Sequence, residues 1–146
     1  MSLFSSTSIA VLSSCDTVMN EARRRFEAGI FPVNASVISR TQSAGRGTHG
    51  RTWVSTEGNL YAALRLDAGL MQAGLLAPQL VSACLLRVVK DLGVEAKLKW
   101  PNDLVINVPG KDWCKAAGIL LERKGELLTA GIGLNLVTSP TAAAMR

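Results

Sequence analysis

A short segment with three glycines, Gly45-x-Gly47-x-x-Gly50, limits the folds that this chain can adopt. In a dinucleotide-binding Rossmann fold, such a pattern follows a strand and opens a helix, so that phosphates meet the helix-terminal N–H groups. Here the glycines follow a strand-like segment, but residues 52–61 lead into another strand and not into a helix. The pattern therefore argues against a Rossmann fold and predicts a flexible loop over residues 43–58.

Hydrophobic periodicity predicts two helices and several strands. One helix is expected to begin at Asp16-Thr17, where a side-chain oxygen can cap it, and to end near Gly29. The other covers residues 78–92 and ends at Gly93. Its apolar stripe consists of Leu80, Ala83, Cys84, Val88 and Leu92. Strand-like segments are expected over residues 9–12, 35–40, 60–66, 97–100, 104–108, 117–121 and 127–136. Because helices and strands do not alternate regularly, the predicted fold class is α+β, with one mixed β-sheet packed against helices.

The amino-acid composition indicates the cellular compartment and limits the classes of ligand that the chain can bind. Three scattered cysteines without a Cys-x-x-Cys pair are typical of a reducing compartment, so we expect a cytoplasmic protein without a disulfide framework. A single histidine, His49, excludes a histidine-rich metal site. No apolar run approaches the ~20 residues that span a bilayer, and no membrane partner is expected. The net charge of +5 suits phosphorylated ligands or an acidic protein. Without a basic helix or an RNA-binding motif, no nucleic acid partner is expected.

Two motifs place cations beside turn residues. In the glycine loop, Arg46 and Arg51 are available to an anion, although a solvated surface loop has the same composition. The second motif, residues 99–103, reads Lys-Trp-Pro-Asn-Asp. Its commoner interpretation is a turn in which the tryptophan, Trp100, anchors the core while the polar side chains bond their own backbone.

Two further motifs lie on predicted strands. Lys115 stands at the mouth of a buried strand beside small residues that let a ligand approach, although a lone lysine there is usually a solvated strand end. Gly131 and Gly133 interrupt the last strand, and glycines within a strand indicate the close approach of a ligand or of another backbone.

Taken in order, these motifs resemble those of the biotin protein ligase family. The chain reads QSAGRGTHGRTW at residues 42–53, GNLY at 58–61, KWPND at 99–103, KAAGILLE at 115–122 and GIGLN at 131–135. The resemblance extends from about residue 12 to residue 135, and five motifs in one order make chance very improbable. It implies the class II synthetase-like catalytic domain of the biotin/lipoate ligase superfamily.

The resemblance also implies a reaction in two halves. Biotin attacks the α-phosphate of ATP, with Mg²⁺, and gives biotinyl-5′-AMP and pyrophosphate. A lysine on the biotin carboxyl carrier domain of a biotin-dependent carboxylase then takes the biotinyl group. The implied enzyme is a biotin–[carboxyl-carrier protein] ligase, whose substrates are biotin, ATP and the carrier.

Site roles follow from the same resemblance. Lys115 is expected to lie beside the biotin carboxyl and the phosphoryl oxygens, and Arg46 is expected to cover biotin and the adenylate. Asp103 is expected to help deprotonate the carrier lysine or to bind Mg²⁺. No protein metal cluster is expected. Biotin contacts are expected from Thr17, Gln42, Gly45, Arg46, Gly47, Lys115 and Gly118. Contacts to ATP or the adenylate are expected from Arg46, Thr48, Arg51, Trp53, Lys99, Asn102, Asp103 and Asn135, with Trp53 packed against adenine.

The chain departs from the family pattern at several points. Val18 replaces a hydroxyl residue, Thr48 replaces the second loop arginine, and residues 107–114 form a longer connection before Lys115. The threonine at position 48 predicts that the biotinyl-5′-AMP intermediate escapes more readily from the site.

We expect one catalytic domain over residues 1–146, without the usual C-terminal β-barrel or an N-terminal DNA-binding domain. A second copy covering an exposed sheet edge would give a homodimer. The alternatives are a relative that binds biotin or biotinyl-AMP with little transfer, and a lipoate or octanoate transfer enzyme on the same fold.

Overall fold

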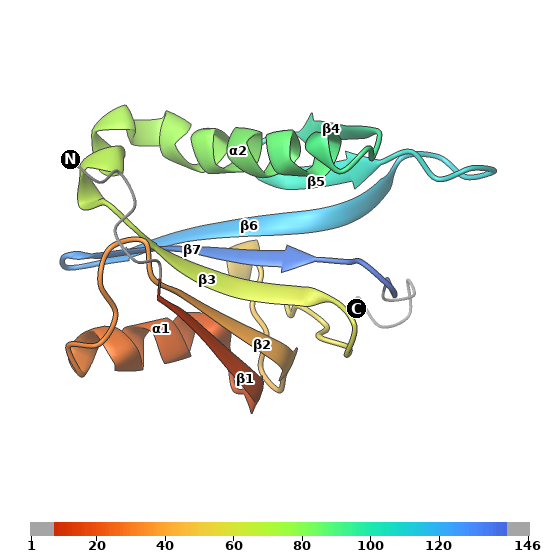
Figure 1. Cartoon of the computed structure of the whole chain (residues 1–146). Helices are drawn as coiled ribbons and strands as arrows, with labels where there is room; N and C mark the ends of the chain where they lie inside the picture. The colour runs from red at the N-terminus through yellow and green to blue at the C-terminus, as the bar shows by residue number, and fades with distance from the viewer. Residues whose placement is uncertain (1–7, 140–146) are drawn as a thin grey trace.

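The computed structural model describes residues 8–139 and contains a seven-stranded mixed sheet with helices on both faces (Figure 1). The strand order is β1-β2-β3-β7-β6-β5-β4; β1 and β2 run parallel and every other neighbouring pair is antiparallel. The strands are β1 Ile9–Cys15, β2 Ser36–Gln42, β3 Leu60–Leu66, β4 Ala96–Lys99, β5 Asp103–Ile106, β6 Cys114–Lys124 and β7 Leu127–Leu134. The α+β prediction is confirmed.

Helix α1 (Val18–Glu27) begins where the sequence predicts. The Thr17 side chain caps it by accepting a 3.0 Å hydrogen bond from the backbone N–H of Asn20. Val18, Met19 and Ala22 face the sheet and are buried, and a positive φ at Gly29 lets the chain turn away. The cap and the apolar face together place the start of α1 beside the end of β1.

Helix α2 (Ala77–Asp91) packs on the opposite face of the sheet. Pro78 lies in its first turn, where a missing N–H costs nothing, and Gly93 with φ 82° follows its end. The buried positions of α2 are Ala77, Ser82 and Val89. All five residues of the predicted stripe are exposed, and Leu80, Cys84 and Val88 among them line a groove. A 3₁₀ segment, η2 (Ala68–Leu76), precedes α2 and was not indicated by the sequence, because it carries no helical periodicity.

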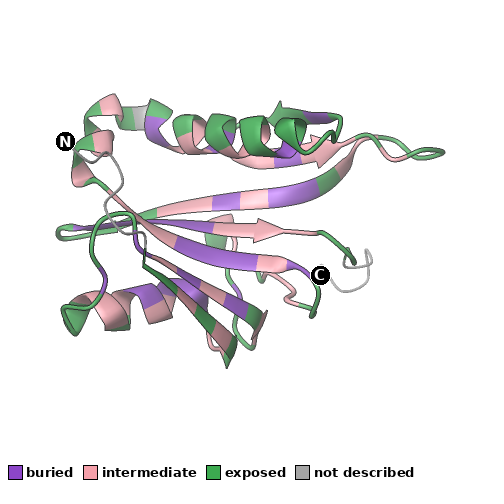
Figure 2. Cartoon of the chain, in the orientation of Figure 1, coloured by how far each residue is buried: buried purple, intermediate pink, exposed green. Residues whose placement is uncertain are grey.

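Each face of the sheet carries its own hydrophobic cluster. One gathers under α1 and includes Val37, Tyr61 and Ala63. The other gathers under α2 and includes Leu104, Ala117 and Ile119. Successive residues of a strand point to opposite faces, so β6 supplies Ala117 and Ile119 to the α2 side while Gly118 faces α1. Figure 2 shows the buried residues concentrated on the central strands and in the first half of α1.

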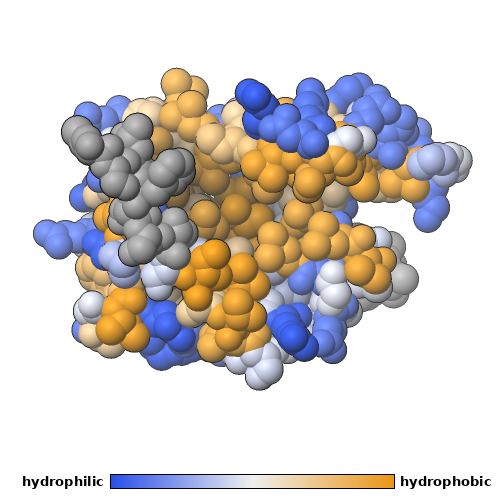
Figure 3. Space-filling model, in the orientation of Figure 1, coloured by the Kyte–Doolittle hydropathy of each residue, from blue (hydrophilic) through white to orange (hydrophobic). Residues whose placement is uncertain are grey.

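An apolar groove of about 380 Å³ runs between α2 and the sheet. Leu64 and Leu66 of β3 and Ile132 of β7 form its floor, and Leu80 and Val88 of α2 form part of its wall. Figure 3 shows apolar side chains gathered on this side of the molecule. Within residues 8–139, no single helix is long and apolar enough to cross a membrane, although one sharply bent pair, Ala68–Gly74 with Ala77–Asp91, meets a test of length and composition alone.

Candidate active site

The floor of the candidate site is a row of paired residues on the α1 face of the sheet. Asp103 of β5 pairs with Gly118 of β6, which pairs with Gly133 of β7. The Trp53 ring lies directly over both glycines. A Cβ built on Gly133 would lie 2.5 Å from Cε2 of Trp53, and one on Gly118 would lie 2.8 Å from Cζ3. The two glycines are therefore required by the close approach of the ring. The sequence predicted the close approach of a ligand or of another backbone at Gly133, whereas the structure places a side chain there.

Lys115 and Asp103 form an ion pair at one end of this floor. The Lys115 Nζ lies 2.7 Å from Oδ1 of Asp103 and 5.4 Å from the centre of the Trp53 ring. The side chains are 45% and 21% exposed, so the pair is open to a ligand. The bulge where β5 meets β6, between Leu104 and Val105, sets Lys115 opposite Val105. Although the connection over residues 107–114 is longer than in the family pattern, Lys115 still lies beside Asp103.

Gln42 joins the glycine loop to the first turn of α1. Its Oε1 accepts a 2.8 Å hydrogen bond from the Val18 N–H, and its Nε2 donates a 2.9 Å bond to Oγ of Ser55. Gly45 lies against this group, and a Cβ there would meet Nε2 of Gln42 at 3.1 Å and Oγ of Ser55 at 2.9 Å. Both polar atoms of the Gln42 amide are therefore bound within the protein, and the buried Thr17 hydroxyl accepts from the Asn20 N–H.

The glycine loop folds as a small hairpin around η1 (Thr48–Gly50). The N–H of Gly47 donates to the carbonyl of Arg51 at 2.7 Å, and the N–H of Trp53 donates to the carbonyl of Gly45 at 2.8 Å. These bonds enclose an isolated bridge between Arg46 and Thr52. In such a non-hydrogen-bonded pair, the N–H and C=O of Arg46 point away from its partner strand. The glycine loop thus directs the backbone N–H and C=O of Arg46 outward.

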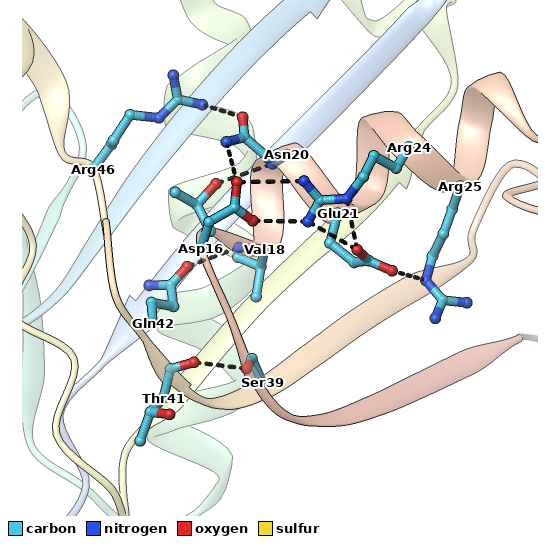
Figure 4. Close-up of polar contacts among 11 residues, drawn as sticks. Asp16, Val18, Asn20, Glu21, Arg24, Arg25, Ser39, Thr41, Gln42 and Arg46 are labelled. Atoms are coloured by element: carbon cyan, nitrogen blue, oxygen red, sulfur yellow. Dashed lines mark hydrogen bonds and ion pairs between the residues drawn. The ribbon is translucent and has the colours of Figure 1, made fainter.

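The Arg46 side chain lies away from Lys115. Its Nη2 donates to Oδ1 of Asn20 at 3.3 Å and lies 3.7 Å from Oε2 of Glu122 (Figure 4 shows the Asn20 contact). Glu122 follows Gly118 by four residues on β6, roughly 13 Å along the strand. The Arg46 guanidinium therefore lies at the Glu122 end of β6, whereas Lys115 pairs with Asp103 at the other end.

Asp16 anchors Asn20 from the other side. Its Oδ2 accepts a 2.7 Å bond from Nδ2 of Asn20, and both carboxylate oxygens accept from the guanidinium of Arg24. These hydrogen bonds, the one from Arg24 first, hold the pKa of Asp16 well below its usual range. The Asp16 carboxylate is therefore ionised at neutral pH and acts only as an acceptor.

The remaining predicted nucleotide contacts divide into two groups. Asn102 is hydrogen-bonded to β6 twice. Its side-chain Nδ2 donates to the Ile119 carbonyl at 2.7 Å, and its backbone carbonyl accepts from the Ile119 N–H at 2.9 Å. Trp100 is 80% exposed, so the interpretation of Trp100 as a core anchor is wrong. Lys99 and Arg51 are exposed. Thr48 is half-buried, and its backbone carbonyl accepts from the Arg51 N–H at 3.3 Å.

Two polar atoms at the site are buried without a partner among the described residues. They are Nε1 of Trp53 and Oδ1 of Asn135, and the backbone of Asn135 is fixed by a 2.7 Å bond to the Ala116 carbonyl. Buried polar atoms normally have partners, so an orphan donor and an orphan acceptor beside one floor indicate a place for a polar ligand. Residues 8–139 hold no cluster of three or more His, Cys, Asp or Glu suited to a metal ion.

Sequence reasoning missed Asn20, Glu122 and Ser55 as parts of the site. Glu122 ends a recognised motif, and Asn20 follows the helix cap by three residues, but neither position has a local pattern that names its partner. Both residues meet Arg46 only because α1 packs on the sheet face to which the Glu122 side chain of β6 points.

Comparison with known proteins identifies relatives over most of the chain. The model of the biotin/lipoate A/B protein ligase family matches residues 16–136. A biotin–[acetyl-CoA-carboxylase] ligase of Paracoccus denitrificans is 38% identical over 124 residues, covering 77% of this chain and 48% of the relative. The bifunctional ligase/repressor BirA of Bacillus subtilis is 36% identical over 121 residues, covering 75% of this chain and 34% of the relative. The chain thus spans about half the length, or less, of these relatives.

Solved structures show the same fold. The biotin protein ligase of Leishmania major in complex with biotinyl-5-AMP has a TM-score of 0.75 and 29% identity, covering 93% of this chain and 60% of that one. The biotin protein ligase of Aquifex aeolicus in complex with biotin and ATP has a TM-score of 0.76 and 25% identity, covering 95% and 57%.

Proposed function

Because the chain belongs to the biotin/lipoate A/B protein ligase family, we propose that it carries out ATP-dependent biotinylation of a carrier protein. In the first step, a biotin carboxylate oxygen bonds to the α-phosphorus of ATP while the bond to the leaving pyrophosphate breaks. In the second, a carrier lysine amine attacks the biotinyl carbonyl, AMP leaves, and the amine gives up its proton.

One observation carries this proposal: the Lys115–Asp103 pair at the end of the floor made by Trp53 and the paired glycines. The first step brings a carboxylate to a polyphosphate, so a fixed cation must offset the repulsion between like charges. Lys115 supplies that charge, and the same ammonium stabilises negative charge on the carbonyl oxygen in the second step. Asp103 holds Lys115, and its carboxylate is proposed to accept the proton of the incoming amine or to bind Mg²⁺.

The orphan polar atoms support a nucleotide beside this floor. The Nε1 of Trp53 would donate to the ligand and the Oδ1 of Asn135 would accept from it, while the indole face offers a flat surface. Mg²⁺ fits a site with a single carboxylate, because it is commonly held by one or two carboxylates together with substrate phosphates. Bound there beside Asp103, the ion would neutralise phosphate charge.

The carrier is proposed to be the biotin carboxyl carrier domain of a biotin-dependent carboxylase. Support comes from the relatives named for acetyl-CoA carboxylase and from the net charge of +5, which favours an acidic partner. We also propose a cytoplasmic location, in keeping with three free cysteines, and a homodimer.

The first half-reaction tests the proposal. With Mg²⁺, ATP and biotin, the protein should exchange labelled pyrophosphate into ATP, and lipoate or octanoate should not replace biotin. Exchange driven by lipoate would instead favour the lipoate alternative. Absence of exchange, with biotin still raising the melting temperature, would favour a relative that only binds biotin.

A further inference from the structure

We propose that Asn20 and Glu122 are positioning residues that bracket the side chain of Arg46 and so hold the glycine loop in place for its ligand. This inference rests on the proposed function. Asn20 lies on α1 and Glu122 on β6, so the bracket ties the loop to two elements at once. The Arg46 guanidinium lies 3.3 Å from the amide oxygen and 3.7 Å from the carboxylate.

The orientation of the Asn20 amide follows from its other neighbour. The Asp16 carboxylate can only accept, so the Nδ2 of Asn20 must face it, at 2.7 Å. The Oδ1 of Asn20 is therefore turned toward Arg46 and accepts from Nη2. Arg24 in turn fixes Asp16 with two hydrogen bonds, of 2.7 Å and 3.3 Å. Figure 4 shows this relay from Arg24 through Asp16 and Asn20 to Arg46.

The bracket acts on the side chain and leaves the backbone of Arg46 available. The bridge to Thr52 directs the N–H and C=O of Arg46 away from the hairpin, and neither group has a hydrogen bond within residues 8–139. Ordering a loop residue costs about 1–2 kcal/mol, so a loop that is already held binds its ligand with less loss of entropy. Asn20 and Glu122 therefore influence ligand affinity without touching the reacting atoms.

The test compares Glu122→Gln with Glu126→Gln, which removes the same charge from an exposed position in the turn after β6. Glu126 has no ion pair within the described part of the chain and serves as the matched control. In ligand-free protein, amide hydrogen exchange over residues 45–50 should be about two- to fivefold faster in Glu122→Gln and Asn20→Ala than in the control. The KM for biotin should rise by about the same factor while kcat stays near wild type.

A double variant checks that Glu122 acts through Arg46. In an Arg46→Ala background, Glu122→Gln should add nothing further to loop exchange or to KM, because the partner is already gone. Unchanged loop exchange in Glu122→Gln, an equal effect in Glu126→Gln, or additive effects in the double variant would overturn the bracket. Wild-type protein that fails to bind biotin would contradict the proposed function instead, and the exchange measurement would still decide the bracket.

Discussion

Replacing Lys115 with alanine is expected to lower the rate of biotinyl-5′-AMP formation by about 10²- to 10³-fold, the usual effect of removing one preorganised group that stabilises transition-state charge. The ammonium lies 2.7 Å from Asp103 and is exposed enough to meet a ligand. Single-turnover measurement of the adenylate, with labelled ATP, reads the effect directly.

Lys111→Ala is the matched control for this variant. Lys111 is an exposed lysine four residues earlier, on the connection between β5 and β6. Its loss removes the same net charge without touching the floor. A Lys115→Ala protein that forms adenylate as fast as Lys111→Ala would show that Lys115 does not carry the chemistry.

Gly133→Ala should both destabilise the fold and weaken ATP binding, because Trp53 is the proposed contact to the nucleotide. The new methyl would lie 2.5 Å from Cε2 and 2.7 Å from Cζ2 and Nε1 of Trp53, so the rigid ring must move off the floor. Overpacking of this kind costs about 1–3 kcal/mol of unfolding free energy. Urea denaturation measures the cost, and calorimetric titration with ATP measures the loss of affinity.

The cost of Gly133→Ala should largely disappear in a Trp53→Ala background, because the three atoms nearest to the new methyl all belong to the Trp53 ring. The double-variant comparison separates the ring contact from a general effect of alanine in β7. An undiminished cost without the Trp53 ring would contradict the account of the floor.

Local patterns were enough to predict most of the elements. β3 occupies residues 60–66 as expected, and Thr17 caps α1, because both depend on neighbouring residues only. Strand order depends on pairing between distant segments and had no local signal. The stripe on α2 shows the same limit, because helical spacing identifies an apolar side of the helix but not what covers that side.

The candidate site was predicted where motifs carry the chemistry and missed where partners meet across the fold. Lys115, Asp103, Gly118 and Gly133 come together around Trp53. The side chain of Arg46 lies elsewhere, because its orientation is set by Asn20 and Glu122 on two separate elements. The exposed position of Trp100 was missed because a tryptophan beside apolar strands ordinarily indicates a core position.

The most direct test of the central claim is transfer of labelled biotin to a biotin carboxyl carrier domain in the presence of Mg²⁺ and ATP. We expect a covalent adduct on one carrier lysine, dependent on ATP and absent with Lys115→Ala. A carrier that stays unlabelled while the protein still binds biotin would contradict the claim that this chain is a biotin ligase.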